Sequence, residues 1–159
     1  MTGGALVVGY GNVFRTDDGL GWHAAERLSD DPRLAGTVIL QRHQLMPELA
    51  YDLSAADLVV FIDATTSKPP GQVDVERVQP LERNGGTWSH HVSPSTLVSL
   101  SHQLYGRATE AYVVSCGVQS VEMGDRLSSV VEAALPQVID AVAELVGSPH
   151  SPKSRTVHT

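Results

Sequence analysis

The chain has 159 residues and a mass of 17.0 kDa, the size of one ordinary domain. Hydrophobic residues make up 42% and charged residues 18%, a balance that supports a packed core and excludes a wholly disordered chain. Eighteen acidic against eleven basic residues give a formal net charge of −7, which argues against nucleic-acid binding and against docking on anionic lipid.

The cysteine content and the hydropathy of the sequence exclude further classes of protein. The single cysteine, Cys116, excludes a disulfide framework and a zinc site made of several thiolates. No run approaches the roughly 18 uninterrupted apolar residues of a membrane span, and residues 1–13 lack the basic region of a signal peptide. We therefore expect a soluble, cytoplasmic protein that contacts no membrane. We also expect it to be a monomer.

Five strands are predicted from short apolar runs bounded by turns. The runs at residues 5–9 (ALVVG) and 57–63 (DLVVFID) are continuous, which is typical of strands buried on both faces, and the second ends in an acid. Residues 73–78 (VDVERV) alternate and follow a turn-rich loop rather than a helix, which predicts an antiparallel edge strand. The remaining predicted strands are residues 37–40 and 111–116.

Helices are predicted between most of these strands. Thr16 or Asp17 can cap a helix whose apolar side carries Leu20, Ala24 and Leu28. The other predicted helices cover residues 47–53, residues 94–105 behind a Ser93 cap, and residues 127–146, where Pro136 should kink or divide the helix. Alternating strands and helices predict an α/β sheet with helices on both faces, and the functional site of such a sheet lies beyond the carboxyl ends of its strands.

Acidic residues lie at two of those strand ends. Asp17 and Asp18 follow the first strand, and Asp63 closes the third. Acids at a helix start commonly cap free amides, and a strand-end acid commonly binds turn amides, so each also has a structural interpretation. The first loop is not a dinucleotide fingerprint, because Phe14 stands where a glycine is required.

Two histidines, His90 and His91, precede the Ser93 cap. An imidazole that joins two carboxylates forms a ligand set for a divalent transition metal, and it can also serve as an acid–base group. His43 and His23 are weaker candidates, and Cys116 is expected to be a buried small hydrophobe within its strand. The segment 117–128 (GVQSVEMGDRLS) is predicted to be a loop that could close over the site.

The motif GYGNVFRTDDGLG at residues 9–21 resembles the N-terminal motif of the hydrogenase maturation proteases, which process the large subunit of [NiFe] hydrogenases. The resemblance continues through HQLMPELA, VVFIDA, SHHVSP and GDRLS, and it spans residues 6–146. It implies a three-layer α/β/α fold, phosphorylase/hydrolase-like, with a five-stranded, mostly parallel sheet in the order 2-1-3-5-4 and one antiparallel strand. The single domain would cover residues 1–146, with residues 147–159 as a disordered tail.

The resemblance also implies site residues. Carried over by position, the family's metal-contacting residues correspond to Asp18, Asp63 and His90, with His91 as the alternative to His90. The implied activity is an endopeptidase that removes a C-terminal extension from the large-subunit precursor after nickel insertion. Hydrolysis would be of the aspartic type, with a carboxylate that activates water, or metal-assisted, with a metal that polarises the scissile carbonyl. Nickel would be contacted through the substrate, and no cofactor would be bound permanently. The alternatives are a non-catalytic chaperone for the nickel-loaded precursor and a small-molecule hydrolase or nucleotide-binding domain on a similar sheet.

Overall fold

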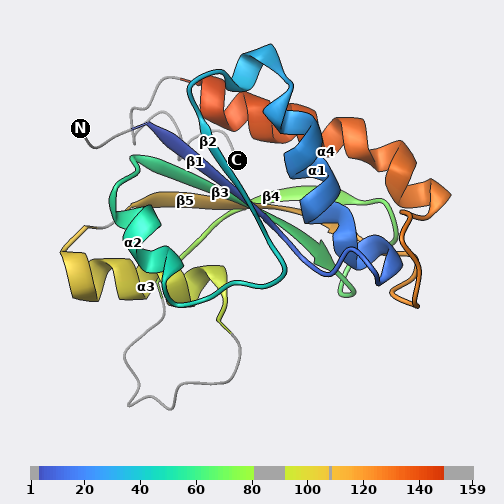
Figure 1. Cartoon of the computed structure of the whole chain (residues 1–159), viewed down its shortest axis with the longest axis horizontal. Helices are drawn as coiled ribbons and strands as arrows, with labels where there is room; N and C mark the ends of the chain where they lie inside the picture. Colours follow the sequence, from blue (N-terminus) through green and yellow to red (C-terminus); the bar gives the residue numbers. More distant parts are fainter. Residues whose placement is uncertain (1–3, 81–91, 108, 149–159) are drawn as a thin grey trace.

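A computed structural model describes residues 4–80, 92–107 and 109–148. Its five strands form one sheet in the order β2-β1-β3-β5-β4. Neighbouring strands are parallel except β4, which pairs antiparallel with β5 at the edge of the sheet (Figure 1). The predicted α/β class, strand order and antiparallel edge strand are therefore confirmed. The strands are β1 (Ala5–Tyr10), β2 (Val38–Arg42), β3 (Leu58–Thr65), β4 (Val73–Arg77) and β5 (Glu110–Gly117).

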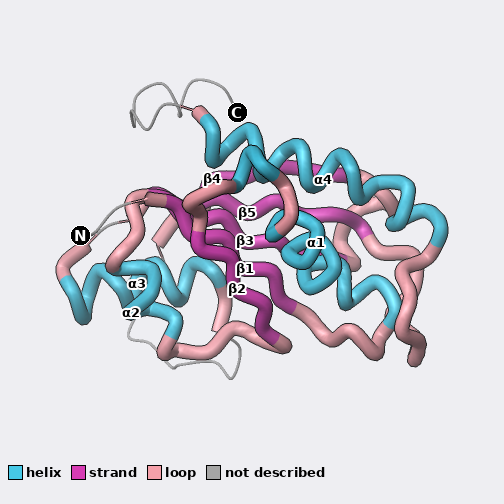
Figure 2. Tube along the Cα trace, turned by 45° about the horizontal axis from the view of Figure 1, so that its top comes forward, coloured by secondary structure: helices cyan, strands magenta, loops and turns pink. Residues whose placement is uncertain are grey.

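Helices cover both faces of the sheet and complete the three layers (Figure 2). On one face lie α1 (Leu20–Ser29) and α4 (Ser129–Gly147); on the other lie α2 (Leu49–Ser54) and α3 (Pro94–Tyr105). Short 3-10 turns occur at Thr16–Gly19 and Pro32–Leu34. Within the described ranges, none of the helices is both long enough and apolar enough to cross a bilayer.

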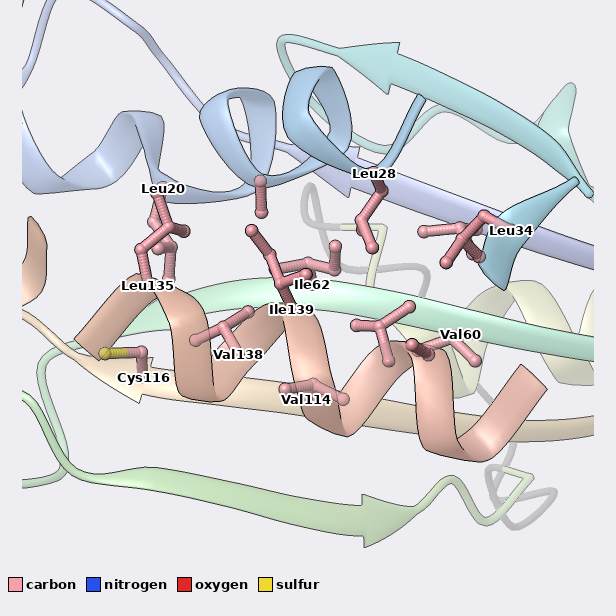
Figure 3. Close-up of a cluster of buried hydrophobic side chains, with 14 of the residues drawn as sticks. Leu20, Leu28, Leu34, Val60, Ile62, Val114, Cys116, Leu135, Val138 and Ile139 are labelled. Atoms are coloured by element: carbon pink, nitrogen blue, oxygen red, sulfur yellow. The ribbon is translucent and has the colours of Figure 1, made fainter. Parts of the chain in front are cut away.

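Successive residues of the central strand face opposite sides of the sheet, as the two-residue period of a strand requires. Val60 and Ile62 pack toward α1 and α4, in the cluster drawn in Figure 3, whereas Val59 and Phe61 pack toward α2 and α3. All four are fully buried, which explains why this strand carries a continuous apolar run. Cys116 is also buried in the first cluster, as predicted.

Three predicted helix boundaries need correction. Residues 16–19 form a 3-10 turn, and α1 begins at Leu20 behind Gly19, so neither Thr16 nor Asp17 caps it. The second helix begins at Leu49, two residues later than predicted. The last helix begins at Ser129, two residues later than predicted, and it continues through the exposed Pro136, so Pro136 does not divide it.

Candidate active site

The site begins where the pairing of β1 with β3 ends. Their register ends with the pair Gly9 and Ile62, so Tyr10 and Asp63 are the next residues on two parallel strands. Both side chains lie on the α2/α3 face, and the Tyr10 hydroxyl donates a hydrogen bond to the Asp63 carboxylate. The third strand continues two residues beyond its predicted end at Asp63, because its pairing with β5 extends to Thr65.

The environment of Asp63 favours its protonated form. Burial is the main cause that raises the pKa of Asp63 to about 6, and the negative charge of Asp18 adds to it. The hydrogen bond from Tyr10 and the positive charge of Lys68 act in the opposite direction. Burial and the charge of Asp63 also raise the pKa of Tyr10, so its hydroxyl remains a donor. Asp63 is therefore a carboxyl group that exchanges protons near neutral pH.

Asp18 reaches the same site from the first loop. One oxygen of its partly buried carboxylate accepts a hydrogen bond of 2.8 Å from the backbone N–H of Asn12. Gly11 has a φ of +140°, and a Cβ at this position would lie 1.9 Å from the Asp18 carbonyl oxygen. Glycine is required here because only a residue without a side chain lets the turn at Asp18 approach the end of β1. Because the charge of Asp18 acts on both Asp63 and Tyr10, these three groups form one electrostatic unit.

Asp17, in contrast, is fully buried and points away from this unit into the loop that joins β5 to α4. Its carboxylate accepts hydrogen bonds from the backbone N–H groups of Gln119, Ser120 and Ser128 and from the Ser128 hydroxyl, at 2.7–3.0 Å. The two adjacent acids therefore have different positions: Asp17 fixes a loop and Asp18 belongs to the site.

The loop between β5 and α4 packs against the first loop. The Thr16 N–H donates to the Gly124 carbonyl, and the Gly124 N–H donates to the Phe14 carbonyl, both at 2.9 Å. Arg15 also donates through Nε to the Val121 carbonyl at 3.0 Å. This loop, which the sequence suggests could close over the site, lies side by side with residues 14–16 and is hydrogen-bonded to them.

The predicted histidines, His90 and His91, lie outside the described residues. The described chain resumes at Val92, and Pro94 and Ser95 at the start of α3 line a pocket of about 480 Å³ whose wall includes Asp63. The start of α3 and Asp63 therefore border the same pocket. Within residues 4–80, 92–107 and 109–148, no three His, Cys, Asp or Glu side chains come together as a metal site. The roles of Asp18, Asp63 and His90 accordingly stay predictions.

Two residues beside Asp63 were missed by sequence reasoning. Tyr10 is apolar in most of its surface, so its position within GYG gave no sign that its hydroxyl would meet a carboxylate. Lys68 lies in the turn-rich loop after β3, and its ammonium group contacts the Ser115 hydroxyl at 3.3 Å and Asp74 at 3.1 Å. Only its proximity to a strand-end acid could have singled it out.

Several solved structures share the fold of this chain. No family model and no curated protein matches the sequence. The HycI [NiFe] hydrogenase maturation protease of Thermococcus kodakarensis KOD1 superposes with a TM-score of 0.70, at 22% identity over 91% of this chain and 93% of that one. The hydrogenase maturating endopeptidase HybD of E. coli gives 0.66, at 25% identity over 87% and 89% of the two chains. The chain has the fold of the hydrogenase maturation proteases.

A third solved structure, the hydrogenase 2 maturation peptidase of a Thaumarchaeota archaeon, has a TM-score of 0.66, at 24% identity over 91% of this chain and 98% of that one. In these three comparisons the shared fold spans 87–91% of this chain and 89–98% of the other chain. The resemblance inferred from the sequence motifs is therefore matched by the three-dimensional structure.

Proposed function

We propose that the chain is an endopeptidase that removes the C-terminal extension of a [NiFe]-hydrogenase large-subunit precursor after nickel insertion. The observation that carries the proposal is the pair Asp18 and Asp63, which interact electrostatically at the carboxyl ends of the strands in a maturation-protease fold. This is the edge at which α/β sheets hold their sites.

Asp18, Asp63 and His90 contact the nickel that the precursor already carries. Two carboxylates and one imidazole leave coordination positions free for substrate groups, so the enzyme has no resident metal. Nickel-loaded precursor brings positive charge to Asp63, and a nearby cation favours the ionised carboxylate. Docking of the correct substrate therefore shifts Asp63, whose pKa is about 6 in the free chain, toward its charged form, which is the form that can accept a proton from water.

The reaction is hydrolysis of one peptide bond. Water adds to the scissile carbonyl carbon, the C–N bond breaks, and a proton passes to the leaving amine. A carboxyl group that is populated in both protonation states near neutral pH can accept the proton from water and return it to the amine. Asp63 meets this requirement because burial raises its pKa.

The chain acts as a monomer in the cytoplasm.

The test is incubation of the purified chain with nickel-loaded and with nickel-free precursor, followed by mass spectrometry of the large subunit. We expect loss of the C-terminal peptide from the nickel-loaded form alone. Asp18→Asn is the matched negative control, because it removes a charge from the site while Asp17 and the loop it fixes remain intact. Stable binding of the nickel-loaded precursor without any change of mass would instead identify a non-catalytic chaperone.

A further inference from the structure

The hydroxyl of Tyr10 is the one group on the neighbouring strand β1 that the described structure places in hydrogen-bond contact with Asp63. Register brings this contact about: β1 and β3 are parallel, their pairing ends at Gly9 and Ile62, and the next residue on each strand faces the same side. The contact therefore follows from the central pair of the sheet and needs no flexible loop.

Tyr10 is itself held firmly. Its backbone pairs with Arg42 of β2, and the next amide, that of Gly11, donates to the Arg42 carbonyl at 3.0 Å. Helix α1 closes the other side through Gly21, where a Cβ would lie 2.5 Å from the Tyr10 nitrogen. The partly buried ring packs on the core beneath α2 and α3. A ring fixed at its backbone and along its side presents its hydroxyl at a fixed position.

Lys68 is the other group that acts on Asp63, and it is less suited to fixing it. Its ammonium group is engaged with the Ser115 hydroxyl at 3.3 Å and with Asp74 at 3.1 Å. It extends from a loop on a long, flexible side chain, so it influences Asp63 through its charge. Of Tyr10 and Lys68, only Tyr10 has both a direct hydrogen bond to Asp63 and a backbone and ring that are held in place.

We infer that Tyr10 is a positioning residue of the active site: its hydroxyl holds one oxygen of the Asp63 carboxylate and thereby directs the other oxygen toward the substrate. The role rests on the proposed peptidase activity, because the substrate that Asp63 meets is the nickel-loaded precursor. Groups that hold a metal-contacting side chain in place are typically worth about 10- to 100-fold in activity or metal affinity.

The test compares Tyr10→Phe with Tyr112→Phe, which removes a hydroxyl from a second tyrosine of the sheet. Tyr112 is fully buried in the core beneath α1 and α4, on the opposite face, and donates to Glu110 at 2.7 Å. We expect Tyr10→Phe to lower kcat at least about 10-fold with KM unchanged, and Tyr112→Phe to leave both constants as in the wild type.

Crystal structures of the two variants supply a readout that does not depend on cleavage. In Tyr10→Phe we expect the Asp63 carboxylate to rotate or to occupy two conformers, and in Tyr112→Phe we expect it to keep its position. An unmoved Asp63 carboxylate in Tyr10→Phe overturns the positioning role whatever the rate. If the wild type cleaves the precursor, a Tyr10→Phe variant with the same kcat as the wild type also overturns it. If the wild type fails to cleave, the proposed function is wrong; a carboxylate that still moves in Tyr10→Phe then shows that Tyr10 fixes Asp63, but not that it acts in peptide hydrolysis.

Discussion

Asp17 and Ser128 are joined twice: the Ser128 backbone N–H donates to one oxygen of the Asp17 carboxylate at 2.7 Å, and the Ser128 hydroxyl donates to the other at 2.8 Å. These residues are 111 positions apart, and Ser128 is the N-cap of α4. The first loop therefore carries the anchor that sets where the last helix begins. This explains why two adjacent acids occur there, one for the loop and one for the site.

Replacing Asp17 by Asn should lower the free energy of unfolding by at least about 2 kcal/mol. The charged acceptor of four hydrogen bonds is lost, and the new amide group points its donors at donors in a fully buried position. Urea unfolding of the variant and the wild type measures the difference. Asp18→Asn is the matched control: its partly buried carboxylate accepts one backbone bond from Asn12, so its stability should change by less than about 1 kcal/mol. Equal losses in the two variants would contradict the separate positions of the two acids.

Asp18→Asn should reduce processing of nickel-loaded precursor by at least about 100-fold while the fold is retained. The carboxylate acts on Asp63 and lies at the loop between β1 and α1, outside the hydrophobic core. Cleavage rates measured well below the melting temperature separate this effect from stability. Normal processing by Asp18→Asn together with loss in Asp17→Asn would show that the site acid is Asp17.

The double variant with Asp18→Asn and Asp63→Asn should be little slower than either single variant. Residues that act as one unit are strongly non-additive, because the first substitution already removes what the second would remove. Single-turnover rates of the wild type, the two single variants and the double variant form a double-mutant cycle that measures this. Losses that multiply would show that the two carboxylates act in separate places, although the charge of Asp18 reaches Asp63 in the structure.

Sequence patterns predicted the sheet well because its strands are dictated by burial. The run 57–63 is apolar since β3 is covered on both faces, and the 73–78 strand is antiparallel since no helix precedes it. The site was only partly predictable. Asp18 and Asp63 stand out as charges at strand ends, but the contact of Tyr10 with Asp63 depends on register, which no single strand reveals. The burial of Asp17 was equally hidden, because its partners come from the other end of the chain.

Asp63 should make the stability of the protein fall between about pH 4 and pH 6. Its pKa is about 6 in the folded state against an ordinary value of 3.8, so the folded state binds more protons in this window. The stabilisation is complete below about pH 4 and is lost as the pH rises to about 6, above which ionised Asp63 costs up to about 3 kcal/mol.

Asp63→Asn removes that cost. We expect the variant to be more stable than the wild type at about pH 7.5, to lose this advantage at about pH 4, and to be inactive in processing. Urea unfolding of both proteins across the pH range tests this, because all other titrating groups are common to the pair. A stability difference that does not depend on pH would contradict the assignment.

The isolated chain should bind divalent transition metals only weakly, and still more weakly below about pH 6. The predicted ligands are Asp18, Asp63 and His90; none is a thiolate, and an imidazole protonates near its ordinary pKa of ~6.5. Calorimetric titration with Ni²⁺ at both sides of that pH gives the affinity. His90→Ala should weaken binding and His91→Ala should not; the reverse would reassign the ligand. Nickel or zinc that survives purification and a chelator at one ion per chain would indicate a resident metal instead.

Removing residues 149–159 should leave both activity and stability nearly unchanged. The last helix ends at Gly147, one residue beyond the predicted end, and Ser148 closes it with its N–H and hydroxyl bound to the Glu144 carbonyl at 3.1 and 2.8 Å. The sequence beyond Ser148, PHSPKSRTVHT, has one apolar residue apart from its prolines, Val157, so we expect its removal to take little apolar surface from the core.

The melting temperature and cleavage rate of three chains decide this: full length, one ending at Ser148 and one ending at Val146. The first two should agree, whereas the third also lacks the residues that close α4 and should melt about 2–4 °C lower. The rival hypothesis is that Lys153 and Arg155 grip the acidic body or the precursor. Exposed charge pairs are worth only about 0–1 kcal/mol, so such a contact would be weak and sensitive to salt. A several-fold loss of rate in the Ser148 chain at low salt that disappears at high salt would establish that these basic residues take part in recognition.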